Sequence, residues 1–152
     1  MSNPNSVPAR CFEELDGPRV TVKANGRVAT FLNPDRIKIR KIDVDCWLQP
    51  VSGLRSDFLL AKAAMVDVII ELKGQDIDHA LKQILATLHH WKTTKLCSPR
   101  CGGLVVFTRS PKRSAMLDNL KLKLLYKHKI WIEMGKSGLR DYEFELFTGT
   151  KR

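Results

Sequence analysis

The first half of the chain is dominated by alternating hydrophobic and polar positions, the pattern of half-buried β-strands. Residues 19–32 alternate on both sides of an Asn-Gly dipeptide, which predicts a hairpin with a two-residue turn. Residues 36–48 also alternate, but their apolar positions change faces midway, so we expect a strand with a bulge there. Two more strands are expected at 57–63 and 65–74.

The second half changes to helical spacing. Apolar residues recur every three or four positions through 75–92, which predicts an amphipathic helix, and a second helix is expected over roughly 111–127. The run at 104–108 is wholly apolar, as in a strand buried on both faces. Closing strands are expected at 130–135 and 142–147. This order predicts the α/β class, with a mixed central β-sheet flanked by helices.

The length of 152 residues favours a single domain spanning 1–152. We expect residues 1–10 to be loosely ordered and 11–17 to form a short helical turn. No apolar run is long enough for a membrane span, and the N-terminus lacks the pattern of a signal peptide. The expected localisation is therefore cytoplasmic.

The charge balance is strongly basic, with 26 Lys and Arg against 16 Asp and Glu and a net charge of +10. Domains this basic tend to bind polyanions, and nucleic acid is the usual one. The alternative is a basic protein whose charge serves only solubility.

Four cysteines, Cys11, Cys46, Cys97 and Cys101, are expected to be reduced thiols in a cytoplasmic protein. The last two are spaced like half of a zinc site, and His90 lies a few residues upstream. A structural zinc site of His90, Cys97 and Cys101 and a simple tight turn are both open interpretations.

Charged residues gather at the end of the apolar strand 66–73, where Glu71 and Lys73 are two positions apart. If this strand forms a hairpin with the strand before it, Asp57 falls opposite Leu72, between the two charges. Three charged groups would then converge. A plain ion pair between Glu71 and Lys73 is the simpler interpretation, but it leaves Asp57 unexplained.

Two neighbouring carboxylates repel each other unless a cation lies between them. Hard oxygen ligands select Mg²⁺ or Mn²⁺, which can polarise a phosphate and acidify a water molecule. A lysine beside them can orient that water or stabilise developing charge. The group therefore suits phosphodiester hydrolysis, and the basic chain suits binding of the polymer.

The stretch SDFLLAKAAMVDVIIELKG resembles the PD-(D/E)xK nuclease superfamily, which includes restriction endonucleases and archaeal Holliday-junction resolvases. The shared pattern is an acid at the start of one strand and Glu-x-Lys at the end of the next. The resemblance implies a restriction-endonuclease-like αβββαβ core. It also implies that Asp57, Glu71 and the carbonyl of Leu72 bind Mg²⁺ or Mn²⁺ and that Lys73 is the catalytic lysine.

The same resemblance points to residues outside the two strands. Many branches carry a glutamine on the following helix, where Gln83 stands, and some carry a glutamate from a helix ahead of the strands, for which Glu13 or Glu14 could serve. The proline of the motif is replaced by Ser56. By analogy with small nucleases that cut two strands, a homodimer is expected.

The predicted helix at 111–127 carries basic residues that could contact backbone phosphate, namely Lys112, Arg113, Lys121 and Lys123. We therefore expect a magnesium-dependent nuclease that hydrolyses phosphodiester bonds, with DNA as the expected substrate. The alternative of another class is a non-catalytic nucleic-acid-binding or assembly subunit on a nuclease-like fold. A structural domain with a chance motif is the third interpretation.

Overall fold

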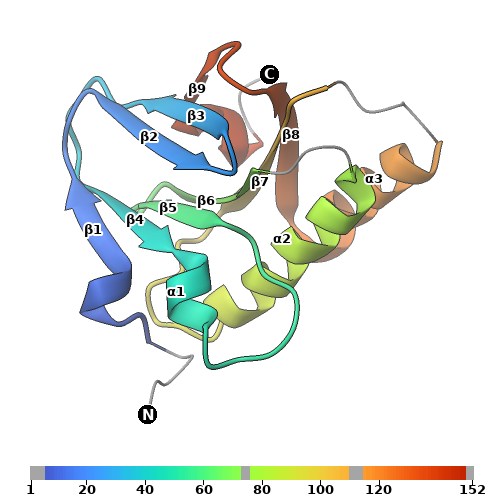
Figure 1. Ribbon diagram of the computed structural model, residues 1–152, viewed down its shortest axis with the longest axis horizontal. Helices are drawn as coiled ribbons and strands as arrows, with labels where there is room; N and C mark the ends of the chain where they lie inside the picture. The colour runs from blue at the N-terminus through green and yellow to red at the C-terminus, as the bar shows by residue number, and fades with distance from the viewer. Residues whose placement is uncertain (1–5, 73–75, 110–114, 150–152) are drawn as a thin grey trace.

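A computed structural model describes residues 6–72, 76–109 and 115–149. Six strands form a mixed sheet in the order β1-β4-β5-β6-β7-β8, and β2-β3-β9 form a second, smaller sheet. The helices cover one face of the large sheet and the small sheet covers the other (Figure 1). The predicted α/β class is confirmed, but the prediction of one sheet is wrong, because the hairpin pairs with β9 instead of joining the large sheet.

The elements in chain order are the 3-10 turn η1 (Ala9–Cys11), β1 (Phe12–Leu15), β2 (Arg19–Ala24), β3 (Arg27–Leu32), β4 (Ile39–Asp43), α1 (Val44–Leu48), β5 (Phe58–Lys62), β6 (Val66–Leu72), α2 (Ile77–Trp91), β7 (Cys101–Phe107), α3 (Ala115–His128), β8 (Ile130–Lys136), β9 (Asp141–Glu143) and the 3-10 turn η2 (Phe144–Thr148).

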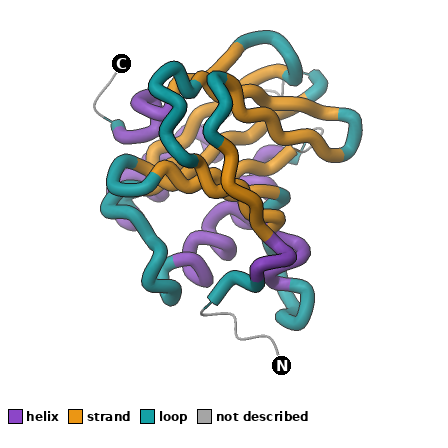
Figure 2. The backbone as a smooth tube through the Cα atoms, turned by 90° about the vertical axis from the view of Figure 1, so that its left-hand side faces the viewer, coloured by secondary structure: helices purple, strands orange, loops and turns teal. Residues whose placement is uncertain are grey.

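Strands β4, β5 and β6 run antiparallel, after which α2 leads to β7 and α3 leads to β8, both parallel to β6. Both crossovers place their helices on one face, where α2 and α3 contact each other. In the side view, strands occupy mainly the upper part of the molecule and helical segments lie beneath them (Figure 2). The C-terminal ends of β6 and β7 therefore share one edge, beside the start of α2.

The β2–β3 hairpin confirms the clearest turn signal of the sequence. Asn25 and Gly26 have φ angles of 55° and 72°, so both occupy the left-handed region that a type I′ turn requires. Arg19 pairs with Leu32 at the open end of the ladder.

The segment 36–48 differs from the prediction. The strand ends at Asp43, whose side chain accepts a hydrogen bond from the backbone N–H of Cys46 and so caps α1. The change of apolar face lies within β4, where the register with β5 is unbroken, so there is no bulge. Both faces of this strand are covered: Ile39 belongs to the core beneath the small sheet and Ile42 to the core beneath the helices.

Two other predicted elements are corrected near the ends of the chain. The helical turn expected at 11–17 is strand β1, which pairs with β4 along the edge of the large sheet. The strand expected at 142–147 is short, since β9 ends at Glu143 and η2 follows. Of residues 1–10, Ala9 and Arg10 belong to η1, whereas 1–5 lie outside the described residues.

The expected helices and buried strand at 75–92, 104–108 and 111–127 are present as α2, β7 and α3. Strand β7 begins three residues early, at Cys101, and the predicted start of α3 lies outside the described residues. Within the described parts of the chain, no helix is both long and apolar enough to cross a membrane.

The cysteines differ from the expectation of four reduced thiols. Cys11 and Cys46 form a disulfide that joins η1 to α1, whereas Cys97 and Cys101 are free. The disulfide forms because β1 pairs with β4, which brings together cysteines 35 residues apart in the sequence.

Candidate functional site

Asp57 immediately precedes β5 and is tied to β6 by two hydrogen bonds. Its N–H donates to the carbonyl of Ile70 over 3.1 Å. Its Oδ2 accepts from the backbone N–H of Leu72 over 2.8 Å. The side chain thus continues the strand pairing past the end of β5, and the half-buried carboxylate is fixed at the C-terminal end of β6.

Glu71 precedes Leu72 on the same strand and is only 3% exposed. Its neighbour two positions earlier, Ile69, belongs to the core beneath the helices, so Glu71 lies on the face that α2 covers. Lys73, the predicted catalytic lysine, follows Leu72 directly in the sequence and lies outside the described residues.

The hairpin register differs by one residue from the prediction. Phe58 pairs with Ile70, so that Asp57 lies opposite Glu71 instead of Leu72. The reason is a turn of three residues between Lys62 and Val66, in which Ala64 has a φ of 66°. The shift places Asp57 directly opposite Glu71, whereas the predicted register placed it opposite Leu72, between Glu71 and Lys73.

Gln83 reaches this region from α2. Its Nε2 donates to the carbonyl of Arg55 over 3.0 Å. Its Oε1 is buried and accepts no hydrogen bond from any described residue. Thr87, one turn later, accepts from the N–H of Ser56 over 2.8 Å. Together these contacts hold the segment that leads to Asp57 against α2 and leave one amide oxygen free for a ligand.

The donor set at the strand ends fits a hard divalent cation. Asp57 and Glu71 supply carboxylate oxygens, and the carbonyl of Leu72 is adjacent in the chain. Mg²⁺ is commonly held by one or two carboxylates and completes its shell with water. These residues could therefore hold Mg²⁺ or Mn²⁺, and the free oxygen of Gln83 could accept from water there.

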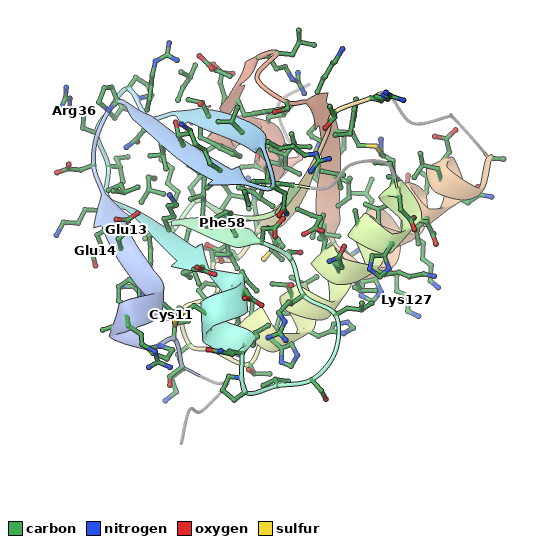
Figure 3. The ribbon with its side chains drawn as sticks, viewed as in Figure 1. Cys11, Glu13, Glu14, Arg36, Phe58 and Lys127 are labelled. Carbon is green, nitrogen blue, oxygen red and sulfur yellow. A yellow bond between two sulfur atoms is a disulfide. The ribbon has the colours of Figure 1, made fainter. Side chains whose placement is uncertain are left out.

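The structure does not bring Glu13 or Glu14 to this site. Both lie on β1 at the edge of the large sheet, not on a helix (Figure 3). Glu13 pairs with Lys41, whose ammonium donates to the carbonyl of Thr21 on the side of the small sheet. The resemblance implied that one of these acids would reach the site from a helix ahead of the strands. Residues Phe12–Leu15 form strand β1 instead.

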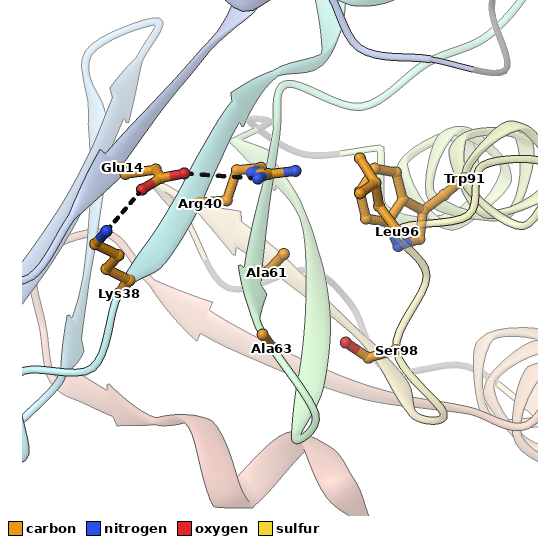
Figure 4. Close-up of a pocket in the computed structure, with 8 residues that line it drawn as sticks. All are labelled: Glu14, Lys38, Arg40, Ala61, Ala63, Trp91, Leu96 and Ser98. Atoms are coloured by element: carbon orange, nitrogen blue, oxygen red, sulfur yellow. Dashed lines mark ion pairs between the residues drawn. The ribbon is translucent and has the colours of Figure 1, made fainter.

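Glu14 lies instead at the other end of the sheet, where it pairs with Lys38 and Arg40. The three residues line a pocket of about 280 Å³, and Trp91 and Ser98 form its opposite wall (Figure 4). Ala61 and Ala63, at the C-terminal end of β5, form its floor, and neither Asp57 nor Glu71 lines it.

The predicted phosphate-binding residues are partly described. Lys123 is exposed on α3, and Lys121 is half-buried on the same helix. Lys112 and Arg113 lie outside the described residues. Since α3 follows β7, the chain enters this helix from the sheet edge that carries Glu71.

A second polar cluster was predicted only in part, because the sequence analysis paired Cys97 with Cys101 but did not join Asp67 to them. Asp67, at the start of β6, is fully buried and approaches the thiols of Cys97 and Cys101, with the three ligand atoms within 4.8 Å of one another. Burial raises the pKa of the Asp67 carboxyl and of both thiols. His90, the conceivable zinc ligand, is not part of this group among the described residues. The strand alternation showed Asp67 as polar but could not show which loop folds onto it.

Comparisons with known proteins found no match to this chain. No family model matches it, and neither does any curated protein or solved structure. The assignment of function therefore rests on the geometry of the site and on the motif.

Proposed function

We propose that this protein is a metal-dependent nuclease that hydrolyses phosphodiester bonds, with DNA as the expected substrate. The observation that carries the proposal is the bond from Leu72 N–H to the Asp57 carboxylate, which fixes one acid beside the buried Glu71. Glu71 is buried and Asp57 is half-buried, and two neighbouring carboxylates repel each other unless a cation lies between them. The next residue is Lys73, which completes the Glu-x-Lys motif.

The order of elements supports the same proposal. Three antiparallel strands, a helix and a parallel strand follow one another as β4, β5, β6, α2 and β7, which agrees with the βββαβ part of a restriction-endonuclease-like core. The chain departs from that core at its start, where β1 stands in place of a helix, and α1 lies between β4 and β5.

Each residue has a distinct role in this proposal. Asp57, Glu71 and the Leu72 carbonyl hold the cation, which when bound polarises the phosphate and acidifies water. Lys73 orients the attacking water or stabilises the charge that develops on the phosphate. Gln83 accepts a hydrogen bond through its free Oε1 and so positions water or substrate.

The test is a cleavage assay with supercoiled, linear, single-stranded and branched DNA and with RNA, in Mg²⁺ or Mn²⁺. We expect cleavage that chelation abolishes and that Glu71→Gln and Lys73→Ala each remove. Cleavage that survives both substitutions would overturn the proposal. Binding without cleavage of any substrate would also overturn it, in favour of the non-catalytic binding subunit.

A further inference from the structure

Two free thiols and a buried carboxylate meet at the N-terminal end of β6, on the opposite end of that strand from Glu71. Cys101 begins β7 and is the direct register partner of Asp67. Cys97 lies in the loop between α2 and β7, and its Sγ is 3.9 Å from that of Cys101. Three ligand atoms from β6, β7 and their connecting loop thus converge on one point.

We propose that Asp67, Cys97 and Cys101 bind one zinc ion. Two thiolates at about 2.3 Å from a tetrahedral zinc ion lie about 3.8 Å apart, close to the sulfur separation observed here. Thiolates are too soft for Mg²⁺, whereas zinc accepts sulfur and carboxylate oxygen together. The three side chains leave the fourth tetrahedral position for water, and Cys97 is only half-buried, so solvent reaches the site.

The carboxylate is held in place by other residues. Trp91 Nε1 donates to its Oδ2 over 2.7 Å, and the N–H and hydroxyl of Ser98 donate to Oδ2 and Oδ1 over 2.6 and 2.7 Å. A carboxylate offers about four acceptor sites, so one remains on Oδ1 for a metal. Hydrogen bonds of this kind orient metal ligands in advance of binding.

The site would act as a clamp on the loop between α2 and β7. Trp91 and Ser98, which hold Asp67, also form one wall of the pocket shown in Figure 4. A zinc ion would fasten this wall to β6 through Cys97. Because the ligands come from β6, β7 and the loop between them, metal binding should raise the melting temperature.

The experiment is a Co²⁺ titration followed by absorption spectroscopy, with Zn²⁺ displacement. The parent for the test is Cys11→Ala/Cys46→Ala, in which Cys97 and Cys101 are the remaining cysteines. We expect one equivalent of Co²⁺ per chain to give a tetrahedral spectrum with a thiolate charge-transfer band, and Zn²⁺ to displace it. Cys97→Ala in this parent should abolish the signal.

Asp67→Asn is the matched variant, because its amide oxygen keeps the bonds from Trp91 and the Ser98 N–H while the Ser98 hydroxyl turns to accept from the amide nitrogen. It should fold and bind Co²⁺ at least about tenfold more weakly. Glu71→Gln should give the same tetrahedral thiolate signal as the parent, which separates this site from the proposed nuclease site. Either a folded parent without a tetrahedral spectrum or unchanged binding by Asp67→Asn would overturn the proposal.

Discussion

Asp57 and Gln83, near the C-terminal end of β6, each make a hydrogen bond that holds the fold and keep another polar atom for the proposed reaction. The Asp57 carboxylate binds the Leu72 N–H through Oδ2 and so replaces a backbone acceptor. Gln83 divides its amide in the same way, since Nε2 donates to Arg55 and Oε1 has no acceptor role among the described residues. Each of these side chains uses one polar atom in the fold and leaves another available to a ligand. Substituting them should therefore change the cleavage rate and the stability by different amounts.

Gln83→Leu should lower the cleavage rate by about 10- to 100-fold, because it removes the oxygen that positions water or substrate. The free energy of unfolding should change by no more than about 1 kcal/mol, since one hydrogen bond is lost together with one unsatisfied buried oxygen. Urea unfolding and cleavage rates under identical conditions measure the two effects.

The control for Gln83 is Thr87→Val, which leaves the Ser56 N–H without its acceptor. This variant should lose about 1–3 kcal/mol of stability and keep the rate of the folded protein. Cleavage by Gln83→Leu at the wild-type rate would contradict the proposed role of Gln83 in positioning water or substrate.

Tyr142 is buried in the core between the two sheets, and the pH dependence of stability tests that burial. Burial raises the pKa of its phenol, and the ring packs against Phe31 with centroids 5.6 Å apart. The native chain therefore holds this proton to higher pH than the unfolded chain. The free energy of unfolding should then fall as the pH rises through about 10.

Tyr142→Phe should remove this part of the alkaline loss, because the variant has no phenol to titrate. Urea unfolding between about pH 8 and 11 for both proteins measures the difference. Equal slopes for the two proteins would contradict the assigned role of burial.

At the scale of elements, the sequence predicted the helices, strands and turns that depend on neighbouring residues. The Asn-Gly turn, the apolar stripe of α2 and the wholly apolar β7 were all read correctly, because each depends on residues near in sequence. Strand β1 and helix α1 were missed, since the first depends on pairing with β4 and the second is only five residues long and follows a strand without a break.

The candidate site was predicted in part for the same reason. The pairing of β5 with β6 follows from their hydrophobic pattern, but the three-residue turn with Ala64 at positive φ has no sequence signal, so the register was wrong by one residue. The cluster of Asp67 with Ser98 joins residues 31 positions apart through an irregular loop, which no periodic pattern describes.

The glycines of β7 allow close packing against η2 on one face of the large sheet and against α2 on the other. A Cβ on Gly102 would lie 2.5 Å from the Cβ of Phe147 in η2, an atom fixed to the backbone. Gly102→Ala should therefore lower the free energy of unfolding by about 1–3 kcal/mol through overpacking. Gly17→Ala is the control, since its nearest atom would be 3.7 Å away, and it should change stability little. Equal losses in urea unfolding for both variants would contradict this packing.

At the scale of the whole molecule, the net charge of +10 is the feature that bears on binding. Binding of a DNA duplex should weaken steeply with salt, because each phosphate contact releases condensed counterions. Lys121→Ala/Lys123→Ala on α3 should reduce the slope of log affinity against log salt by up to about 2. Fluorescence anisotropy over a series of salt concentrations measures the slope.

The matched control removes two cations that do not belong to α3. Lys23 is exposed on β2, and Arg36 is exposed between β3 and β4 and lies far from the end of α3 marked by Lys127 (Figure 3). Lys23→Ala/Arg36→Ala changes the net charge equally and should leave the slope unchanged. The same loss of slope in both variants would show that binding follows total charge and not the α3 surface.

The most direct test of the nuclease assignment is the rate of Mg²⁺-dependent DNA cleavage by Asp57→Asn. The variant retains an oxygen for the Leu72 N–H but loses the charge that a cation needs. Asp141→Asn is the control, because it removes an equal charge from an exposed ion pair with Arg19. The account predicts a rate at least about 100-fold lower for Asp57→Asn and an unchanged rate for Asp141→Asn. Cleavage by a folded Asp57→Asn protein at the wild-type rate would contradict it.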